Sequence, residues 1–186
     1  FADGRAVFQD KIYLTPDEKE WGWEPGTQLN VFNSPWGRTA ILICFDCEFP
    51  SVSRLMAGAR PDLILVPSWT STTAGLNRVE WAARSRAIEH YAFVIKTATV
   101  PDPSSPLPNF GQATIVGPQD ASVAPIAVQG ALNQSSIVYA ALDISAARTA
   151  RSRTGYDPVG EESRRTAPLV LNPPAPATQQ DSRAQE

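Results

Sequence analysis

The chain has 186 residues, enough for one domain with a sizeable hydrophobic core. Hydrophobic residues make up 42% and charged residues 19%, and 16 basic against 19 acidic side chains give a formal charge of −3. The scattered, slightly acidic charge excludes an electrostatic nucleic-acid surface, and no apolar run reaches the length of a membrane span. No signal-peptide pattern opens the sequence, so we expect a cytoplasmic protein that binds neither nucleic acid nor membrane.

Predicted strands and helices alternate in the first half of the chain. Residues 1–10 are expected to be extended, and 15–27 to form a polar loop that contains tryptophans. Strands are then predicted at 29–32, 39–44, 62–66 and 92–97, and helices at 50–58 and 76–91. Most of these strands are continuous apolar runs, which is typical of strands buried on both faces of a sheet. The order strand, helix, strand, helix, strand predicts an α/β fold.

The second half of the chain has shorter predicted elements. Four prolines mark 101–108 as a loop; short strands are predicted at 112–116, 123–128 and 137–141, and a short helix at 143–150. Asp143 or Ser145 is the expected N-cap of that helix. From Asn172 the chain is rich in Pro, Ala, Gln and charge, with little to bury. We therefore expect one domain at 1–171 and a disordered tail at 172–186.

The two cysteines, Cys44 and Cys47, lie three positions apart. This spacing permits a redox pair, half of a zinc site, or a nucleophile with a bystander. A closed zinc site usually needs four ligands, and His90 is the only other soft ligand, so we expect no metal and a structural role for this histidine. On composition alone, Cys44 could also be a small buried hydrophobic residue.

The position of Cys44 favours a nucleophile. It ends a predicted strand, which is where open α/β sheets place their ligands. A sharp turn there can expose the sulfur and direct the next backbone N–H, that of Phe45, at a developing oxyanion. A thiolate is a good nucleophile, but a base or a nearby cation has to generate it.

Four segments in register resemble the nitrilase superfamily of carbon–nitrogen hydrolases. KIYLTPDEKEW resembles its lysine block, GRTAILICFDCEFPSVSRL its nucleophile block, and DLILVPSWTS and RSRAIEHYAFVIKTA the segments that follow. LTPDEKEWG and CFDCEFP are closer to the predicted amidohydrolase branch than to true nitrilases. The resemblance implies an α/β fold of the α-β-β-α sandwich type, which we expect to be incomplete at its N-terminus here, and no metal or organic cofactor.

The resemblance also implies a catalytic set of Glu, Lys, Glu and Cys. The lysine corresponds to Lys11, the nucleophile to Cys44, and the second glutamate to Glu18, with Glu20 as a competitor because this loop varies in length. The first glutamate, the general base, should precede Lys11. Residues 1–10 contain no glutamate, so we expect the base to lie upstream of Phe1.

Each member of this set has a chemical role. The glutamate base takes the thiol proton and later protonates the leaving amine. Lys11 stabilises the tetrahedral intermediate together with the Phe45 N–H, and it lowers the thiol pKa. Glu18 keeps Lys11 charged and orients the substrate.

Further residues near this set are candidates for supporting roles. Glu20, Glu48 and Trp69 are candidates for lining the substrate pocket; Glu48 stands where many family members carry arginine, and Trp69 follows a strand end. Asp46 is expected to brace the turn after the nucleophile, and Cys47 to be a bystander.

The sequence is compatible with three functions. The favoured one is hydrolysis of a small-molecule amide through a Cys44 thioester, carried out by a homodimer or larger homo-oligomer. The second is a catalytically incomplete chain that serves as an assembly module. The third is a thiol–disulfide oxidoreductase using Cys44 and Cys47, which is disfavoured because a redox pair usually opens a helix, whereas Glu48 and Pro50 follow here. Nitrile, amide, carbamoyl amine and acyl-transfer chemistries all occur in the superfamily.

Overall fold

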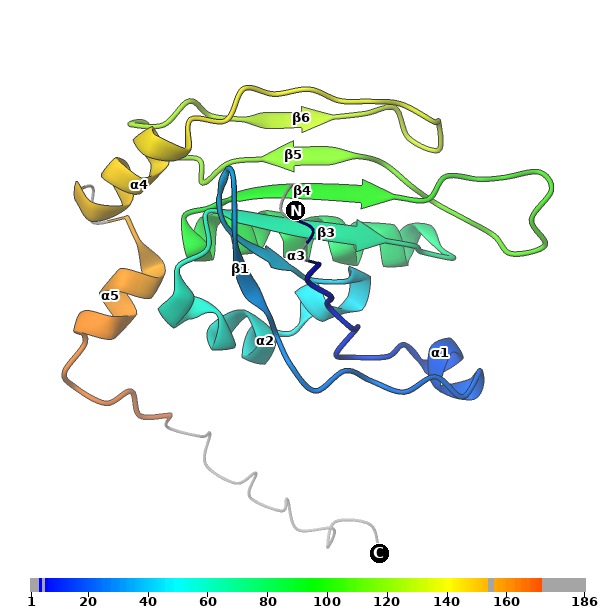
Figure 1. The fold of residues 1–186 in the computed structure, drawn as a ribbon, viewed down its shortest axis with the longest axis horizontal. Helices are drawn as coiled ribbons and strands as arrows, with labels where there is room; N and C mark the ends of the chain where they lie inside the picture. Colours follow the sequence, from blue (N-terminus) through cyan, green and yellow to red (C-terminus); the bar gives the residue numbers. More distant parts are fainter. Residues whose placement is uncertain (1–3, 5, 154–155, 172–186) are drawn as a thin grey trace, which may run out of the picture.

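The computed structural model describes residue 4 and the ranges 6–153 and 156–171, and in them six strands form one sheet (Figure 1). The order of the strands across the sheet is their order in the chain. The pairs β2–β3 and β3–β4 are parallel, and the remaining neighbours are antiparallel. The strands are β1 (Val31–Ser34), β2 (Gly37–Ile41), β3 (Leu63–Ser68), β4 (Phe93–Ala98), β5 (Thr114–Val116) and β6 (Ala127–Gln129).

Helices make the two crossovers between the parallel strands. α2 (Pro50–Leu55) lies between β2 and β3 in the chain, and α3 (Thr73–His90) lies between β3 and β4. The other helical segments are α1 (Pro16–Glu20), the 3₁₀ helices η1 (Cys44–Glu48) and η2 (Ala57–Ala59), α4 (Ile144–Arg153) and α5 (Pro158–Arg164). None of the helices in the described ranges combines the length and the apolar character that crossing a membrane requires.

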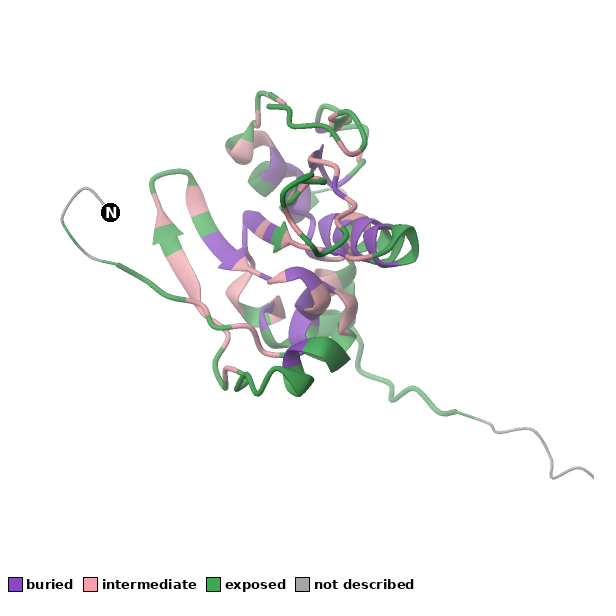
Figure 2. Ribbon diagram, turned by 90° about the vertical axis from the view of Figure 1, so that its right-hand side faces the viewer, coloured by how far each residue is buried: buried purple, intermediate pink, exposed green. Residues whose placement is uncertain are grey.

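Alternation along the central strands divides the core between the two faces of the sheet. In β3, Ile64 and Val66 pack with α2 and α3, whereas Leu63 joins a second cluster with Ala147 and Ala150 of α4. Buried positions accordingly concentrate in the sheet and in α3 (Figure 2). The prediction that these apolar runs are strands buried on both faces is therefore confirmed for β3.

The predicted strand at 137–141 is wrong. Within the described residues no strand lies between β6 and α4, and Ile137 and Tyr139 are 77% and 80% exposed. An apolar segment becomes a strand only where a neighbouring strand accepts its hydrogen bonds. The predicted strand at 123–128 is reduced to β6, because Val123 closes a turn by donating its N–H to the Asp120 carbonyl. The predicted tail at 172–186 lies outside the described residues.

The region predicted as a loop at 15–27 contains the short helix α1. Thr15 is its N-cap: the Thr15 hydroxyl accepts the Glu18 N–H, and the Glu18 carboxylate accepts the Thr15 N–H, which is a capping box. Pro16 occupies the first turn, where it costs no hydrogen bond. The helix α5 was not predicted either, because none of its residues is buried and no apolar periodicity marks it.

Candidate active site

Cys44 lies in a sharp turn beyond the end of β2, where it opens η1. The strand ends at Ile41, three residues earlier than predicted. Cys44 has φ of 52°, the left-handed region that a residue with a side chain occupies at a cost of about 1–3 kcal/mol. Its thiol lies 3.3 Å from the carbonyl oxygen of Trp69, just beyond the end of β3. Strain of this kind is typical of functional positions.

Lys11 and Glu18 form a close ion pair beside this turn. Lys11 Nζ lies 2.5 Å from Glu18 Oε1 and 2.6 Å from Oε2, and both side chains are about nine-tenths buried. Burial alone raises the pKa of Glu18, but hydrogen bonds from Lys11 and Thr15 and the lysine charge together lower it below its ordinary value. Glu18 is therefore a carboxylate that holds the ammonium group in place.

Asp46 connects the segment that follows Lys11 to the turn that contains Cys44. Its Oδ1 accepts the N–H groups of Ile12 at 3.1 Å and Tyr13 at 2.7 Å, and its Oδ2 accepts that of Ile43 at 3.1 Å. The carboxylate is fully buried, and the Tyr13 ring stacks on Phe49 with centroids 3.7 Å apart. Two segments more than 30 positions apart in the chain are thereby held side by side.

The surroundings of the Cys44 thiol act on its pKa in opposite directions. Burial is the largest cause and raises the pKa above its ordinary value. Backbone contact with Trp69, the Lys11 charge and a hydrogen bond from the Phe45 N–H lower it, and the Glu18 carboxylate raises it. The balance is a raised pKa, so the resting group is a thiol that needs a base before it can attack.

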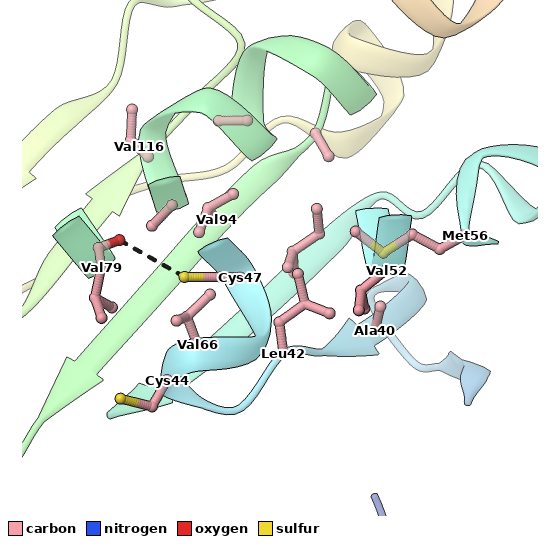
Figure 3. Packing of buried hydrophobic residues seen from close by; sticks show 14 residues of the cluster. Ala40, Leu42, Cys44, Cys47, Val52, Met56, Val66, Val79, Val94 and Val116 are labelled. Carbon is pink, nitrogen blue, oxygen red and sulfur yellow. Dashed lines mark hydrogen bonds between the residues drawn. The ribbon is translucent and has the colours of Figure 1, made fainter. Parts of the chain in front are cut away.

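Cys47 faces the core rather than the site. It is fully buried with Sγ 3.8 Å from the Val79 carbonyl, while Cys44 lies at the edge of the same cluster (Figure 3). Burial raises the pKa of Cys47 to about 12. Both cysteines are free thiols. This arrangement disfavours a redox pair, because neither partner is an accessible thiol of low pKa.

Two cavities meet at Cys44 and share Lys11, Glu18 and Trp69 as lining. The first, the polar cavity, has a volume of about 390 Å³ and is further lined by Phe45, Glu48, Thr70, Thr72 and Arg78. The second, the tryptophan cavity, has a volume of about 540 Å³ and is further lined by Trp21, Trp23, Ile43, Pro67 and Leu107. Both sizes are in the range of small-molecule sites.

The structure thus brings most of the sequence-predicted site residues together. Glu48 lines the polar cavity and accepts a hydrogen bond from Arg78 Nε at 3.0 Å, and Trp69 lines both cavities. Glu20 is exposed at the end of α1 and lines neither of them.

Sequence reasoning did not single out several residues that line the cavities: Arg78, Thr72, Trp21, Trp23 and Leu107. For Trp21 and Trp23 a signal was present, since Trp-Gly-Trp begins only three positions after Glu18. No comparable signal marked the arginine, which reads as one of several charges on a helix.

Comparison with known proteins gives a family match over most of the chain. The Carbon-nitrogen hydrolase family profile matches residues 9–152. The probable hydrolase YhcX of Bacillus subtilis (strain 168) is 32% identical over 135 residues, covering 70% of this chain and 26% of that protein. The human omega-amidase NIT2 is 25% identical over 141 residues, covering 76% of this chain and 46% of that enzyme.

Solved structures agree on the fold. Nit3 of Saccharomyces cerevisiae, a member of branch 10 of the nitrilase superfamily, superposes with a TM-score of 0.67 at 23% identity, covering 81% of this chain and 53% of that one. The nitrilase-type α/β fold is confirmed, and the described residues form one sheet of the expected two-sheet sandwich. The chain spans about half, or less, of the length of the curated relatives it matches. It belongs to the carbon–nitrogen hydrolase family.

Proposed function

We propose that this protein hydrolyses an amide-type carbon–nitrogen bond through a thioester on Cys44, with Lys11 and Glu18 as its catalytic partners. The observation that carries the proposal is the convergence of three groups on one cavity. A cysteine in a strained turn meets an ammonium group that a buried carboxylate holds in position. Family membership and the omega-amidase relative support an amide rather than a nitrile as substrate.

The proposed reaction has two steps. The Cys44 thiolate attacks the amide carbonyl, and the negative oxygen that develops is stabilised by Lys11 and the Phe45 N–H. The C–N bond then breaks as the amine takes up a proton. Water attacks the thioester, the C–S bond breaks, and the carboxylic acid leaves while Cys44 regains its proton.

Glu18 is better suited to holding Lys11 than to removing the thiol proton. Both of its oxygens accept from Lys11 Nζ, and its lowered pKa makes it a weak base. The resemblance assigns the base to a different glutamate that precedes Lys11, and residues 1–10 contain none. Because the chain spans about half, or less, of the length of its curated relatives, the test of catalysis uses the protein expressed from its complete gene.

The test is a screen of amides, carbamoyl amines and nitriles, with released ammonia or amine as the readout. Cys44→Ala should lower amide hydrolysis at least about 1000-fold, and Lys11→Met about 100-fold or more. Cys47→Ala should keep most of the activity, because its thiol lies outside both cavities. Equal activity of Cys44→Ala and the wild type would overturn the proposal, and a folded protein without any hydrolysis would favour an assembly module instead.

We also propose that the protein is a homodimer or a larger homo-oligomer, as the resemblance implies. Trp81 and Ile88 lie seven positions apart on α3, 68% and 51% exposed, and so form an apolar stripe on one side of the helix. Light scattering after size-exclusion chromatography should give at least twice the monomer mass, and Trp81→Glu should reduce it. A monomer at micromolar concentration would contradict this.

A further inference from the structure

Three indole rings line the tryptophan cavity, whose lining also includes Cys44. The ring centroids of Trp21 and Trp23 are 5.3 Å apart and those of Trp21 and Trp69 are 6.1 Å apart. Trp21 is 46% exposed and Trp23 56% exposed, and Leu107 adds an exposed apolar side chain from the loop after β4. Tryptophan is highly buried on average, so this much exposed indole in a cavity beside a nucleophile indicates a surface that binds an apolar group.

The charges in the tryptophan cavity are already paired. Its lining contains Lys11 and Glu18, whose side chains neutralise one another at 2.5 Å. A charged substituent would lose its hydration here without gaining a partner, which is costly. The polar cavity differs, because Thr70, Thr72 and the Glu48–Arg78 pair can replace water as hydrogen-bonding partners.

The chemistry of thioester hydrolysis assigns the two cavities to the two parts of an amide. Water attacks the thioester from the position that the amine has left, because the second step retraces the first with water in place of the amine. The amine side must therefore admit water, which suits the polar cavity. The acyl side is best kept dry, which suits the indoles.

We propose that the tryptophan cavity binds the acyl group of the substrate and selects an uncharged, apolar acyl chain. This inference rests on the proposed thioester chemistry at Cys44. It narrows the substrate class to amides of apolar carboxylic acids, either longer aliphatic or aromatic ones. Trp23 is the best residue to probe, because its side chain lines this cavity whereas Trp21 also caps α1.

The inference can be tested by acyl transfer to Cys44 from a homologous series of thioesters. Acetyl, butanoyl and hexanoyl thioesters of 2-mercaptoethanesulfonate share one anionic leaving group, which the tryptophan cavity disfavours. The Cys44 thiolate forms the new thioester as the leaving thiolate departs, so the step needs no proton donor. Intact mass spectrometry of the protein from its complete gene detects the adduct, and released 2-mercaptoethanesulfonate measures the rate where water cleaves the adduct again. Each rate is divided by that of N-acetylcysteine with the same thioester.

The normalised rate should rise about fourfold for each added methylene in the wild type. Trp23→Ala should flatten this dependence, and the matched control Trp36→Ala should leave it unchanged, because Trp36 lies in the β1–β2 turn at the opposite end of β2 from Cys44. A rate independent of chain length in the wild type, or an unaltered dependence in Trp23→Ala, would overturn the inference.

The outcomes also separate this inference from the proposed function. Chain-length-dependent adducts without amide hydrolysis would refute the hydrolase proposal while supporting the acyl cavity. Amide hydrolysis that is indifferent to the acyl chain would refute the acyl cavity and leave the hydrolase proposal standing. Failure of every thioester to react at Cys44, with neither an adduct nor release of 2-mercaptoethanesulfonate above the level of Cys44→Ala, would overturn both.

Discussion

Burial raises the pKa of the Cys44 thiol, and two charged side chains of opposite sign modulate it. Lys11 favours the thiolate and Glu18 disfavours it. We therefore predict that Lys11→Met slows alkylation by neutral iodoacetamide and that Glu18→Gln accelerates it, each by about 3- to 10-fold at fixed pH. The measurement is the rate of carbamidomethylation at Cys44, followed by peptide mass spectrometry.

Cys47 provides the internal control for this experiment. Its burial and its raised pKa of about 12 should keep it unmodified until denaturant is added. The Cys44 rate should keep rising with pH beyond the ordinary thiol range, because its pKa is raised. A faster reaction of Lys11→Met, or labelling of the folded protein at Cys47, would show that the local charges do not act as described.

His90 makes stability depend on pH. It is fully buried, with Nε2 2.6 Å from Ser53 Oγ, and burial followed by the charges of Arg86, Arg60 and Arg151 lowers its pKa from 6.5 to about 4. The unfolded chain therefore binds a proton at His90 more readily than the folded chain does. The stability that neutral, buried His90 contributes is complete above pH 6.5 and is lost as the pH falls toward 4. From pH 7 to 5 we expect a loss of about 2 kcal/mol in the free energy of unfolding.

Urea denaturation at pH 7 and pH 5 measures this loss. His90→Asn keeps a hydrogen-bonding group beside Ser53 but cannot be protonated, so its free energy of unfolding should change much less over the same range. The same pH dependence in the variant and the wild type would assign the effect to other groups.

At the scale of elements, Asp46 connects the segment before α1 to η1. Asp46→Ala leaves three backbone N–H groups without their acceptor, and we expect the free energy of unfolding to fall by about 3–5 kcal/mol. Asp46→Asn keeps one oxygen acceptor and should lose less. Because Lys11 is positioned by the same segment, the alkylation rate of Cys44 in Asp46→Asn should approach that of Lys11→Met. A fully stable Asp46→Ala variant would contradict this account.

Elements that contain a continuous apolar run could be predicted from the sequence. Elements that depend on a few polar contacts were harder to predict. The runs at β3 and β4 indicate buried strands directly, and 50–58 indicates α2 through its proline. The helix α1 depends on the capping box of Thr15 and Glu18, which the sequence displays but which was outweighed by the surrounding prolines and glycines. The segment 137–141 has the right composition for a strand, yet it forms none within the described residues, and composition alone does not reveal this.

The candidate site likewise contains residues that the sequence indicated and residues that it did not. Cys44, Lys11 and Glu18 were selected because their segments resemble the family's motifs, and the structure brings them to one cavity. Arg78 and Leu107 come from elements far along the chain, and only tertiary packing brings them to Cys44. Sequence spacing carries no information about such contacts.

At the scale of the whole molecule, a buried carboxylate fastens α4 to the sheet. Asp62, at the start of β3, is 2% exposed and accepts two hydrogen bonds from Arg148, at 2.6 and 2.9 Å; Arg151 lies 3.5 Å away. Burial raises the pKa of Asp62, but Arg148, the Arg38 N–H and Arg151 together bring it below its ordinary value. Its contribution to stability is therefore present above the ordinary aspartate pKa and lost as the pH falls through the lowered one.

Removing this carboxylate should loosen the second face of the sheet. Asp62→Ala is expected to lower the free energy of unfolding by about 3–5 kcal/mol, since it leaves the nearly buried Arg151 without its anionic partner. Asp102→Ala, in the exposed loop after β4, is the matched control and should change the urea midpoint little. An unchanged midpoint in Asp62→Ala would show that α4 is held by apolar packing alone.

The order of the strands in the sheet has a consequence for how the chain folds during synthesis. Each strand from β2 to β6 lies beside the strand that precedes it in the chain. Its neighbour in the sheet has therefore already been synthesised when the strand leaves the ribosome. The hydrogen bonds from Arg148 of α4 to Asp62 join residues that are 86 positions apart in the chain. The cysteine turn and its neighbouring strands can thus assemble before the segment that secures the far side of the sheet has been translated.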